Sequence, residues 1–483
     1  MTRRSLLILF LFAATTALAQ FPGMPQLPTD PATDKVLAEI KDHSQVMDNL
    51  AYLSDMIGGR VTGGENSRKA HEWTVAKFRE YGLENVHLET YKIAHSWKRG
   101  RASARLLQPV ERPLTVASMG WSISTRGAVR GPVMLVEATR KEDLDKYKGK
   151  LKGAIVITRR PPPRAPLTPP PPRPFFVNSP LPPGGDMESI FRTFMQFRLE
   201  LSDFLKAEGA LAVLSMTDKD EGLLNMSSAG GEFLPGALPS AVTTREDYTL
   251  LYRLLERKAT VEMELDLENA LSPGAVDAYN TVAELRGSEK PDEVVILGAH
   301  LDSWDLGTGA TDNGTGSMAV LEAARALKAT GSAPKRTIRF VLFSGEEQGL
   351  VGSREYVKAH RAELDKVSGV LVHDTGTGRV KSIGLENYYA SRETMDQILA
   401  PLASLRLEEL SMVRQFGTDH FSFAIAGVPA FACVQDMADY RLTHHSQSDT
   451  FDKVVKDDLV QGAQVLAGWA LRTANWKEMI PRK

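Results

Sequence analysis

The sequence contains very little cysteine, and this excludes several kinds of protein. It has 483 residues and one cysteine, Cys433. A single cysteine cannot form a disulfide within the chain, and it cannot build a zinc site from several thiolates. Cys433 lies in the apolar run 428–434, which indicates a buried thiol rather than a catalytic nucleophile. Any protein-bound metal must therefore use histidine and carboxylate ligands.

The sequence also lacks an excess of charge of either sign. Lysine and arginine number 58 against 60 aspartate and glutamate, a formal net charge of -2. A chain this balanced has no overall positive field to attract nucleic acid or an anionic membrane surface. Hydrophobic residues make up 42% of the chain, which is ordinary for a globular protein and sufficient for more than one core. We expect no nucleic-acid partner.

The apolar run at the N-terminus, Leu6–Ala14, is shorter than the ~20 residues that a membrane-spanning helix needs. Arg3 and Arg4 precede it, and small residues at positions 17 and 19 follow it. This pattern is typical of a secretory signal peptide cleaved near residue 19. We therefore expect residues 1–19 to be removed, leaving a secreted or periplasmic protein without a membrane anchor. The arginine pair leaves both the general secretory and the twin-arginine routes open.

The first part of the chain changes character several times. Residues 20–34 are rich in proline and polar residues and are predicted to form a flexible leader. Residues 38–81 show the apolar spacing of helices. Prolines crowd residues 159–183, which predicts an extended loop, either a solvated excursion or an active-site lid. Short β-like runs occupy residues 131–136, 152–158, 210–215 and 260–265.

From about residue 275 onward, strand and helix patterns alternate. The predicted strands are 294–297, 337–343, 369–372 and 428–434, with helices at 317–327, 350–363, 393–405 and 454–474. Short continuous apolar strands separated by helices are typical of a parallel sheet covered on both faces. We expect an α/β fold with a doubly wound, mainly parallel sheet. Residues 35–117 and 269–483 would form this domain, and residues 118–268 a β-rich insert.

Polar side chains follow nearly every predicted strand of this sheet. Because ligands gather beyond the carboxyl ends of parallel strands, we expect these side chains to meet at one edge. They are His300, Asp302, Asp312, Glu346, Glu347, Asp374, His444, His445 and Asp449.

Each of these segments alone has a simpler interpretation. His300 could be a strand-end histidine bonded to a carbonyl, residues 312–314 a plain turn, and residues 344–347 a helix capping box. Residues 314–319 imitate a dinucleotide fingerprint, but no apolar strand directly precedes them. Together, however, converging histidines and carboxylates would repel one another strongly unless cations compensated them. Mixed imidazole and carboxylate ligands suit a pair of zinc ions.

The neighbouring glutamates Glu346 and Glu347 can divide two tasks between them, because adjacent side chains point in different directions. One can bind metal while the other accepts a proton from the attacking water and returns it to the leaving amine. Asp302 is placed to accept the second ring N–H of His300, and Asp449 could do the same for His445.

The segments 298–304, 309–316, 343–353, 373–378, 417–423 and 444–450 together resemble the M28 family of zinc peptidases, especially its carboxypeptidase Q-like (plasma glutamate carboxypeptidase-like) branch. The resemblance covers most of the chain from residue 35 to 480. It implies the zinc-exopeptidase, or phosphorylase/hydrolase-like, fold. It also implies two Zn²⁺ ions per chain and Glu346 as general base. The implied ligands of the first ion are Asp312, Glu347 and His445, and those of the second are His300, Asp312 and Asp374.

The same resemblance implies that residues 118–268 form a protease-associated (PA)-like domain, and that relatives act mainly on dipeptides and short peptides, often as homodimers. Some relatives carry a tyrosine where this chain has His444, so the donor to the oxyanion stays open. The expected function is a secreted dinuclear zinc exopeptidase of the carboxypeptidase or dipeptidase type. The alternatives are an aminopeptidase of the same family, a hydrolase of other amides such as a glutaminyl cyclase, and a non-catalytic receptor-like member.

Overall fold

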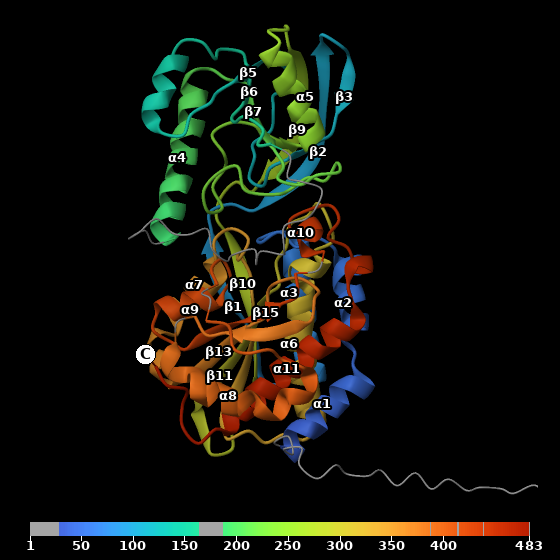
Figure 1. Cartoon of the computed structure of the whole chain (residues 1–483), viewed down its shortest axis with the longest axis vertical. Coiled ribbons are helices and arrows are strands. Elements are labelled where there is room, and N and C mark those ends of the chain that lie inside the picture. The colour runs from blue at the N-terminus through green and yellow to red at the C-terminus, as the bar shows by residue number, and fades with distance from the viewer. Residues whose placement is uncertain (1–28, 164–186, 387, 413–414, 438, 483) are drawn as a thin grey trace, which may run out of the picture.

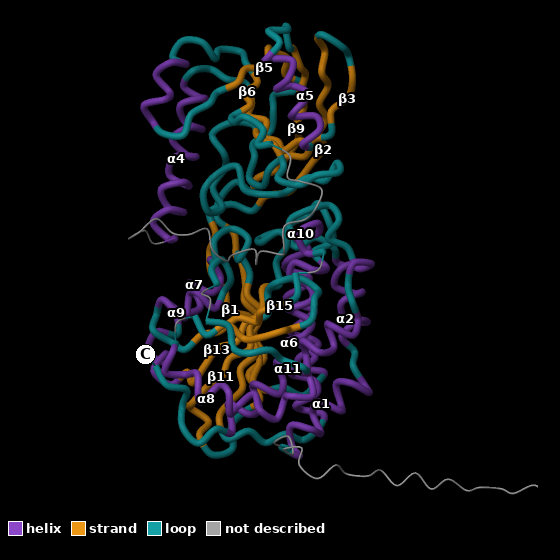
Figure 2. Tube along the Cα trace, in the orientation of Figure 1, coloured by secondary structure: helices purple, strands orange, loops and turns teal. Residues whose placement is uncertain are grey.

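The structure is a computed structural model that describes residues 29–163, 187–386, 388–412, 415–437 and 439–482. The chain forms two lobes, each built around its own β-sheet (Figures 1 and 2). The larger lobe holds a seven-stranded sheet and most of the helices. Among the described residues, the smaller lobe holds an eight-stranded sheet and two α-helices. No described helix is long and apolar enough to cross a membrane.

The seven-stranded sheet is mixed rather than mainly parallel. Its four central strands run parallel, as the alternating pattern predicted, whereas β10 and β14 run antiparallel to their neighbours. The sequence pattern did not predict β1, β10 and β14, because these flanking strands are not uniform apolar runs. The strand order is β1 (Glu84–Ile93), β10 (Val276–Leu285), β12 (Arg336–Phe343), β11 (Lys290–His300), β13 (Val367–Val372), β15 (Ala430–Gln435) and β14 (Val380–Gly384).

Helices cover both faces of this sheet, and the alternation of side chains along each strand explains why. In β11, Val295 and Leu297 belong to one hydrophobic core, while Val294 and Ile296 belong to the other. Each side chain of this size contributes roughly 1.5–3 kcal/mol when fully buried. The first face carries α1 (Pro31–His43), α2 (Val46–Ala51), α3 (Glu65–Glu80), α6 (Thr315–Ala329), α8 (Arg392–Leu399) and α11 (Lys456–Asn475), and the second carries α7 (Val351–Ala359) and α9 (His420–Ile425).

The eight-stranded sheet contains all four β-like runs that the sequence predicted, and it also includes β2 and β3, which precede residue 118. Helices α4 (Met187–Ala207) and α5 (Arg245–Glu256) accompany it and were not predicted. Its strand order is β3 (Arg112–Leu114), β2 (Trp97–Gln108), β9 (Glu262–Leu271), β5 (Val129–Leu135), β6 (Ile155–Ile157), β7 (Ala212–Met216), β8 (Ser240–Thr243) and β4 (Val116–Ser118).

Three predicted segments, namely the signal peptide, the leader and the proline-rich loop, lie wholly or partly outside the described residues. The predicted signal peptide and residues 20–28 of the leader lie outside them, as do residues 164–183 of the proline-rich loop. Helix α1 begins at Pro31, and the Asp30 carboxylate caps it by accepting the amides of Ala32 and Thr33. The last four residues of the predicted leader, 31–34, are therefore helical.

Candidate metal centre

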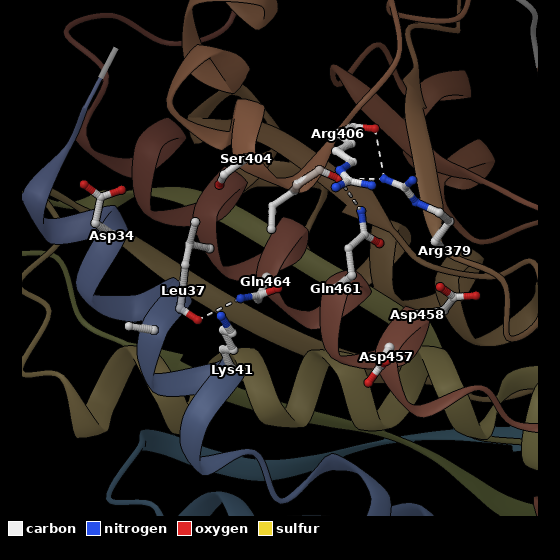
Figure 3. Close-up of a pocket in the computed structure, with 12 residues that line it drawn as sticks. Asp34, Leu37, Lys41, Arg379, Ser404, Arg406, Asp457, Asp458, Gln461 and Gln464 are labelled. Carbon is white, nitrogen blue, oxygen red and sulfur yellow. Dashed lines mark hydrogen bonds between the residues drawn. The ribbon is translucent and has the colours of Figure 1, made fainter. Parts of the chain in front are cut away.

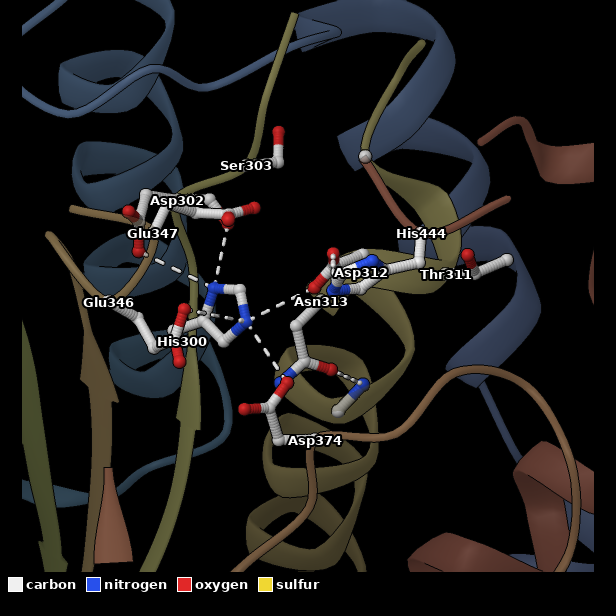
Figure 4. A network of polar contacts seen from close by, with 12 residues as sticks. His300, Asp302, Ser303, Thr311, Asp312, Asn313, Glu346, Glu347, Asp374 and His444 are labelled. Carbon is white, nitrogen blue, oxygen red and sulfur yellow. Dashed lines mark hydrogen bonds and ion pairs between the residues drawn. The ribbon is translucent and has the colours of Figure 1, made fainter. Parts of the chain in front are cut away.

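The six residues that the sequence proposed as metal ligands and base lie together at the carboxyl edge of the parallel strands. Figure 4 labels all of them except His445. They come from strand ends, from the loops after the strands and from the segments beside two helices. His300 ends β11, the two glutamates follow β12, Asp374 follows β13, Asp312 precedes α6, and His445 follows α10 (Tyr440–Thr443).

His300 forms one half of the cluster. Its Nε2 atom lies 3.0 Å from Asp374 Oδ1, 3.3 Å from Asp312 Oδ1 and 3.9 Å from Glu346 Oε2. The His300 side chain is 1% exposed, so these groups meet away from bulk water.

His445 forms the other half. Its Nε2 atom lies 2.9 Å from Glu347 Oε2 and 3.5 Å from Asp312 Oδ2. The two oxygens of Asp312 thus face different histidines. The ring of His444 stacks on that of His445 with centroids 3.6 Å apart, and its Nε2 atom lies 3.9 Å from Asp312 Oδ2.

The donor atoms of this cluster fit divalent cations. Potential ligand atoms fall into groups of three within 4.8 Å of one another, and Asp312 belongs to two such groups. Asp312 Oδ2 and Glu347 Oε1 are buried without a hydrogen-bond partner. A buried carboxylate oxygen in that state is strongly disfavoured unless a cation satisfies it. Oxygen and imidazole donors at this spacing match the preferences of zinc.

The pKa values of the cluster follow from burial and crowding of charge. Burial raises the pKa of Glu346 well above its usual range, and the charges of Asp374 and Glu347 raise it further. Burial likewise raises the pKa of Glu347 to about 7. Burial lowers the pKa of His445, but the Glu347 carboxylate beside it outweighs burial and raises the value to about 9. Since cations must displace such protons, metal affinity will depend on pH.

The loop that carries Asp312 is held from behind by Asp449. The Asp449 carboxylate accepts the amide of Thr311 at 2.6 Å, its hydroxyl at 2.9 Å, and the amide of Asp312 at 3.3 Å. The sequence had suggested Asp449 as an acceptor for the ring of His445. Within the described residues it supports Asp312 instead, because the turn after Ser446 directs it toward the Asp312 loop.

A close backbone approach fixes the other end of the same loop. Asn313 donates its side-chain amide to the carbonyl of His373 at 2.8 Å and accepts the amide of Gly316 at 2.9 Å. A Cβ atom at Gly316 would lie 2.2 Å from the His373 carbonyl oxygen. The glycine therefore lets the start of α6 approach the loop of Asp374, which brings Asp312 and Asp374 to one place.

Asp302 lies beside His300, as the sequence suggested. The ring atom Nδ1 of His300 lies 3.0 Å from the backbone carbonyl of Asp302 and 3.5 Å from its carboxylate. The hydroxyl of Thr62 donates to the other carboxylate oxygen of Asp302 at 2.8 Å and accepts the amide of Gly345 at 2.9 Å. Thr62 thus connects the loops of His300 and of the two glutamates.

Arg60 is a site residue that the sequence did not indicate. Its fully buried guanidinium donates to the carbonyls of Leu301, Gly58, Thr308 and Gly309 at 2.6–3.0 Å. Burial lowers the pKa of Arg60 to about 10, and nearby carboxylates of the site oppose this fall. The Arg60 guanidinium therefore connects the carbonyl of Gly58 to three carbonyls of the loop after β11. An arginine within a glycine-rich stretch was the only sequence signal.

A surface pocket of about 710 Å³ lies elsewhere, between α1 and α11 (Figure 3). Its lining does not include the metal-centre residues. Gln464 donates to the carbonyl of Leu37 at 2.8 Å, and Arg379 donates to the carbonyls of Leu405 and Arg406 at 2.7 and 3.0 Å.

Comparisons with known proteins identify the family of this chain. The profile of peptidase family M28 matches residues 280–470. Carboxypeptidase Q from Pongo abelii is 30% identical over 445 residues, covering 92% of this chain and 88% of its own, and the Bos taurus protein is equally similar.

A solved structure, the peptidase M28 precursor from Shewanella amazonensis SB2B, superimposes with a TM-score of 0.77. It is 27% identical in sequence, and the match covers 93% of this chain and 98% of the other. The zinc aminopeptidase BSAP from Bacillus subtilis shares the fold, with a TM-score of 0.63, 20% identity, and coverage of 92% and 95%.

The fold and the site define a metallopeptidase. The chain belongs to peptidase family M28.

Proposed function

We propose that this protein is a secreted dinuclear zinc exopeptidase of the carboxypeptidase or dipeptidase type, which hydrolyses dipeptides or short peptides. The observation that carries the proposal is the position of Asp312. Its two oxygens face His300 and His445 at 3.3 and 3.5 Å, as a carboxylate shared between two cations requires.

In this proposal Asp312, Glu347 and His445 hold one zinc ion, and His300, Asp312 and Asp374 hold the other. The two ions supply Lewis acidity that activates water and polarises the scissile carbonyl. Support comes from the buried, unsatisfied oxygens of Asp312 and Glu347 and from the zinc aminopeptidase that shares the fold.

Glu346 is the proposed general base. Its carboxylate reaches within 3.9 Å of His300 Nε2, and the side chain is 11% exposed, so it lies at the cluster with access from outside. It accepts a proton from the attacking water and delivers it to the leaving amine.

The choice of substrate rests on relatives. The carboxypeptidase Q proteins align over most of this chain at about 30% identity, whereas the aminopeptidases of known structure are less similar in sequence. On this basis we also propose that the lobe with the eight-stranded sheet is the PA-like insert and that residues 1–19 direct export. Homodimer formation stays a prediction.

The test is metal analysis and peptide hydrolysis with wild-type protein and Glu346→Gln. We expect two zinc ions in both proteins and a loss of several orders of magnitude in kcat for the variant, because water would bind without a proton acceptor. Normal turnover by Glu346→Gln would show that the base is another residue. Dipeptides with free or blocked ends separate the alternatives: loss of cleavage only on blocking the amine would indicate an aminopeptidase.

A further inference from the structure

The loop between β7 and β8, residues 217–239, leaves the eight-stranded sheet and reaches the segment that carries the two adjacent histidines. The amide of Met226 donates to the carbonyl oxygen of His445 at 2.8 Å. The amide of Leu224 donates to Gln447 Oε1 at 2.9 Å. The insert therefore bonds directly to the backbone of a proposed metal ligand and to the side chain two residues beyond it.

Two more contacts extend this junction. Gln447 returns a hydrogen bond from Nε2 to the carbonyl of Gly222 at 3.3 Å. The ammonium group of Lys219 donates to the carbonyl of Arg441 at 2.8 Å, four residues before His445. The Lys219 side chain is 1% exposed, and this bond is partly buried in the junction between the lobes. The histidine segment is thus held at both ends.

The loop itself is firmly anchored. Leu224 and Met226 are buried in an aromatic cluster with Trp121 and Trp304. Trp304 follows β11, and its ring lies 6.1 Å from the ring of His445. This cluster contains residues of both lobes, and Trp304 is its contact with His445. A displacement of the loop would therefore also displace Trp304.

The backbone of His445 needs such support. Its φ angle is +58°, in the left-handed region that residues other than glycine rarely adopt. A conformation of this kind persists only when its surroundings determine it. The bond from Met226 fixes the carbonyl of His445, and with it the direction of the side chain whose Nε2 lies 2.9 Å from Glu347.

We propose that the β7–β8 loop is a positioning element of the metal centre, which holds His445 in the geometry for binding zinc. The smaller lobe then supports the metal site directly. This inference rests on the proposed function, because it assigns His445 to one of two zinc ions. The positioning residues are Gln447 and Lys219, which act through His445 and do not touch the metal.

The experiment removes zinc from loaded protein with a competing chelator and follows both ions at equilibrium. The variants are Gln447→Leu and Lys219→Met. The control is Glu264→Gln, which breaks an exposed ion pair with Arg130 on the same sheet but away from the loop. Partners that orient a metal ligand typically change affinity by 10–100-fold when removed. We expect a loss of that size for one zinc ion, an unchanged second ion, and wild-type behaviour in the control.

The thermal midpoint of each metal-free variant separates positioning from folding. For Gln447→Leu we expect a midpoint close to that of metal-free wild type together with the loss at one ion. Unchanged affinity for both ions, or equal loss of both, would overturn the proposal. If Lys219→Met does not fold, Gln447→Leu decides. Wild-type protein that binds two zinc ions and cleaves dipeptides supports the proposed function whatever the variants show, so the two hypotheses can fail separately.

Discussion

Replacing Arg60 by methionine tests whether a buried guanidinium supports the metal centre. Arg60 makes four charge-assisted hydrogen bonds to carbonyls, at 2.6–3.0 Å. Bonds to a charged group contribute at least about 1.5 kcal/mol each, or about 6 kcal/mol for the four. The fall in the pKa of Arg60 to about 10, which is the net of burial and the nearby carboxylates that oppose it, corresponds to about 3 kcal/mol against the charged form, and the variant no longer carries this cost. We therefore expect Arg60→Met to lower the free energy of unfolding by about 3 kcal/mol.

The assay is urea unfolding of metal-free protein at pH 7.5, followed by circular dichroism, with wild type and Arg60→Met side by side. Arg130→Met serves as a control, because Arg130 is 67% exposed and its ion pair with Glu264 should contribute less than about 1 kcal/mol. If Arg60→Met costs no more than the control, the four carbonyl bonds do not stabilise the loops as argued. If Arg60→Met also weakens zinc binding, the loop after β11 depends on Arg60 for the conformation that supports the metal centre.

Three further predictions follow from the same geometry. Asp449→Asn should weaken zinc binding by roughly 10–100-fold, measured by chelator competition, because the carboxylate accepts two amides of the Asp312 loop. Asp312→Ala should lose both zinc ions by metal analysis, and retention of two would exclude a shared carboxylate. Burial lowers the pKa of His71 to about 4, so below pH 6.5 the unfolded chain binds a proton that the folded protein does not. Stability should therefore fall from pH 6.5 toward pH 4, by about 2 kcal/mol at pH 5 from this group, and His71→Gln should have a flatter profile in urea unfolding.

The central part of the fold could be predicted because its signals are local. Continuous apolar strands such as 337–343 and helices such as α6, whose apolar residues recur at helical spacing, differ in period, and both occur where expected. The flanking strands could not be predicted in the same way. β1 is half-exposed along most of its length, and its pairing with β10 joins residues nearly two hundred positions apart. This pairing forms only when the intervening lobe has folded and brings the chain back beside β1.

The same division applies to the candidate site. The sequence determined which side chains reach the carboxyl edge of the sheet, because parallel strands all end there, and His300, Glu346 and Asp374 each follow one. Only the tertiary structure decided what orients them: Asp449 on the Asp312 loop, Arg60 among four carbonyls, and the β7–β8 loop on His445. The hydrophobic period of each strand and helix is a local property of the sequence, whereas hydrogen bonds between distant loops exist only after the cores of both lobes have packed.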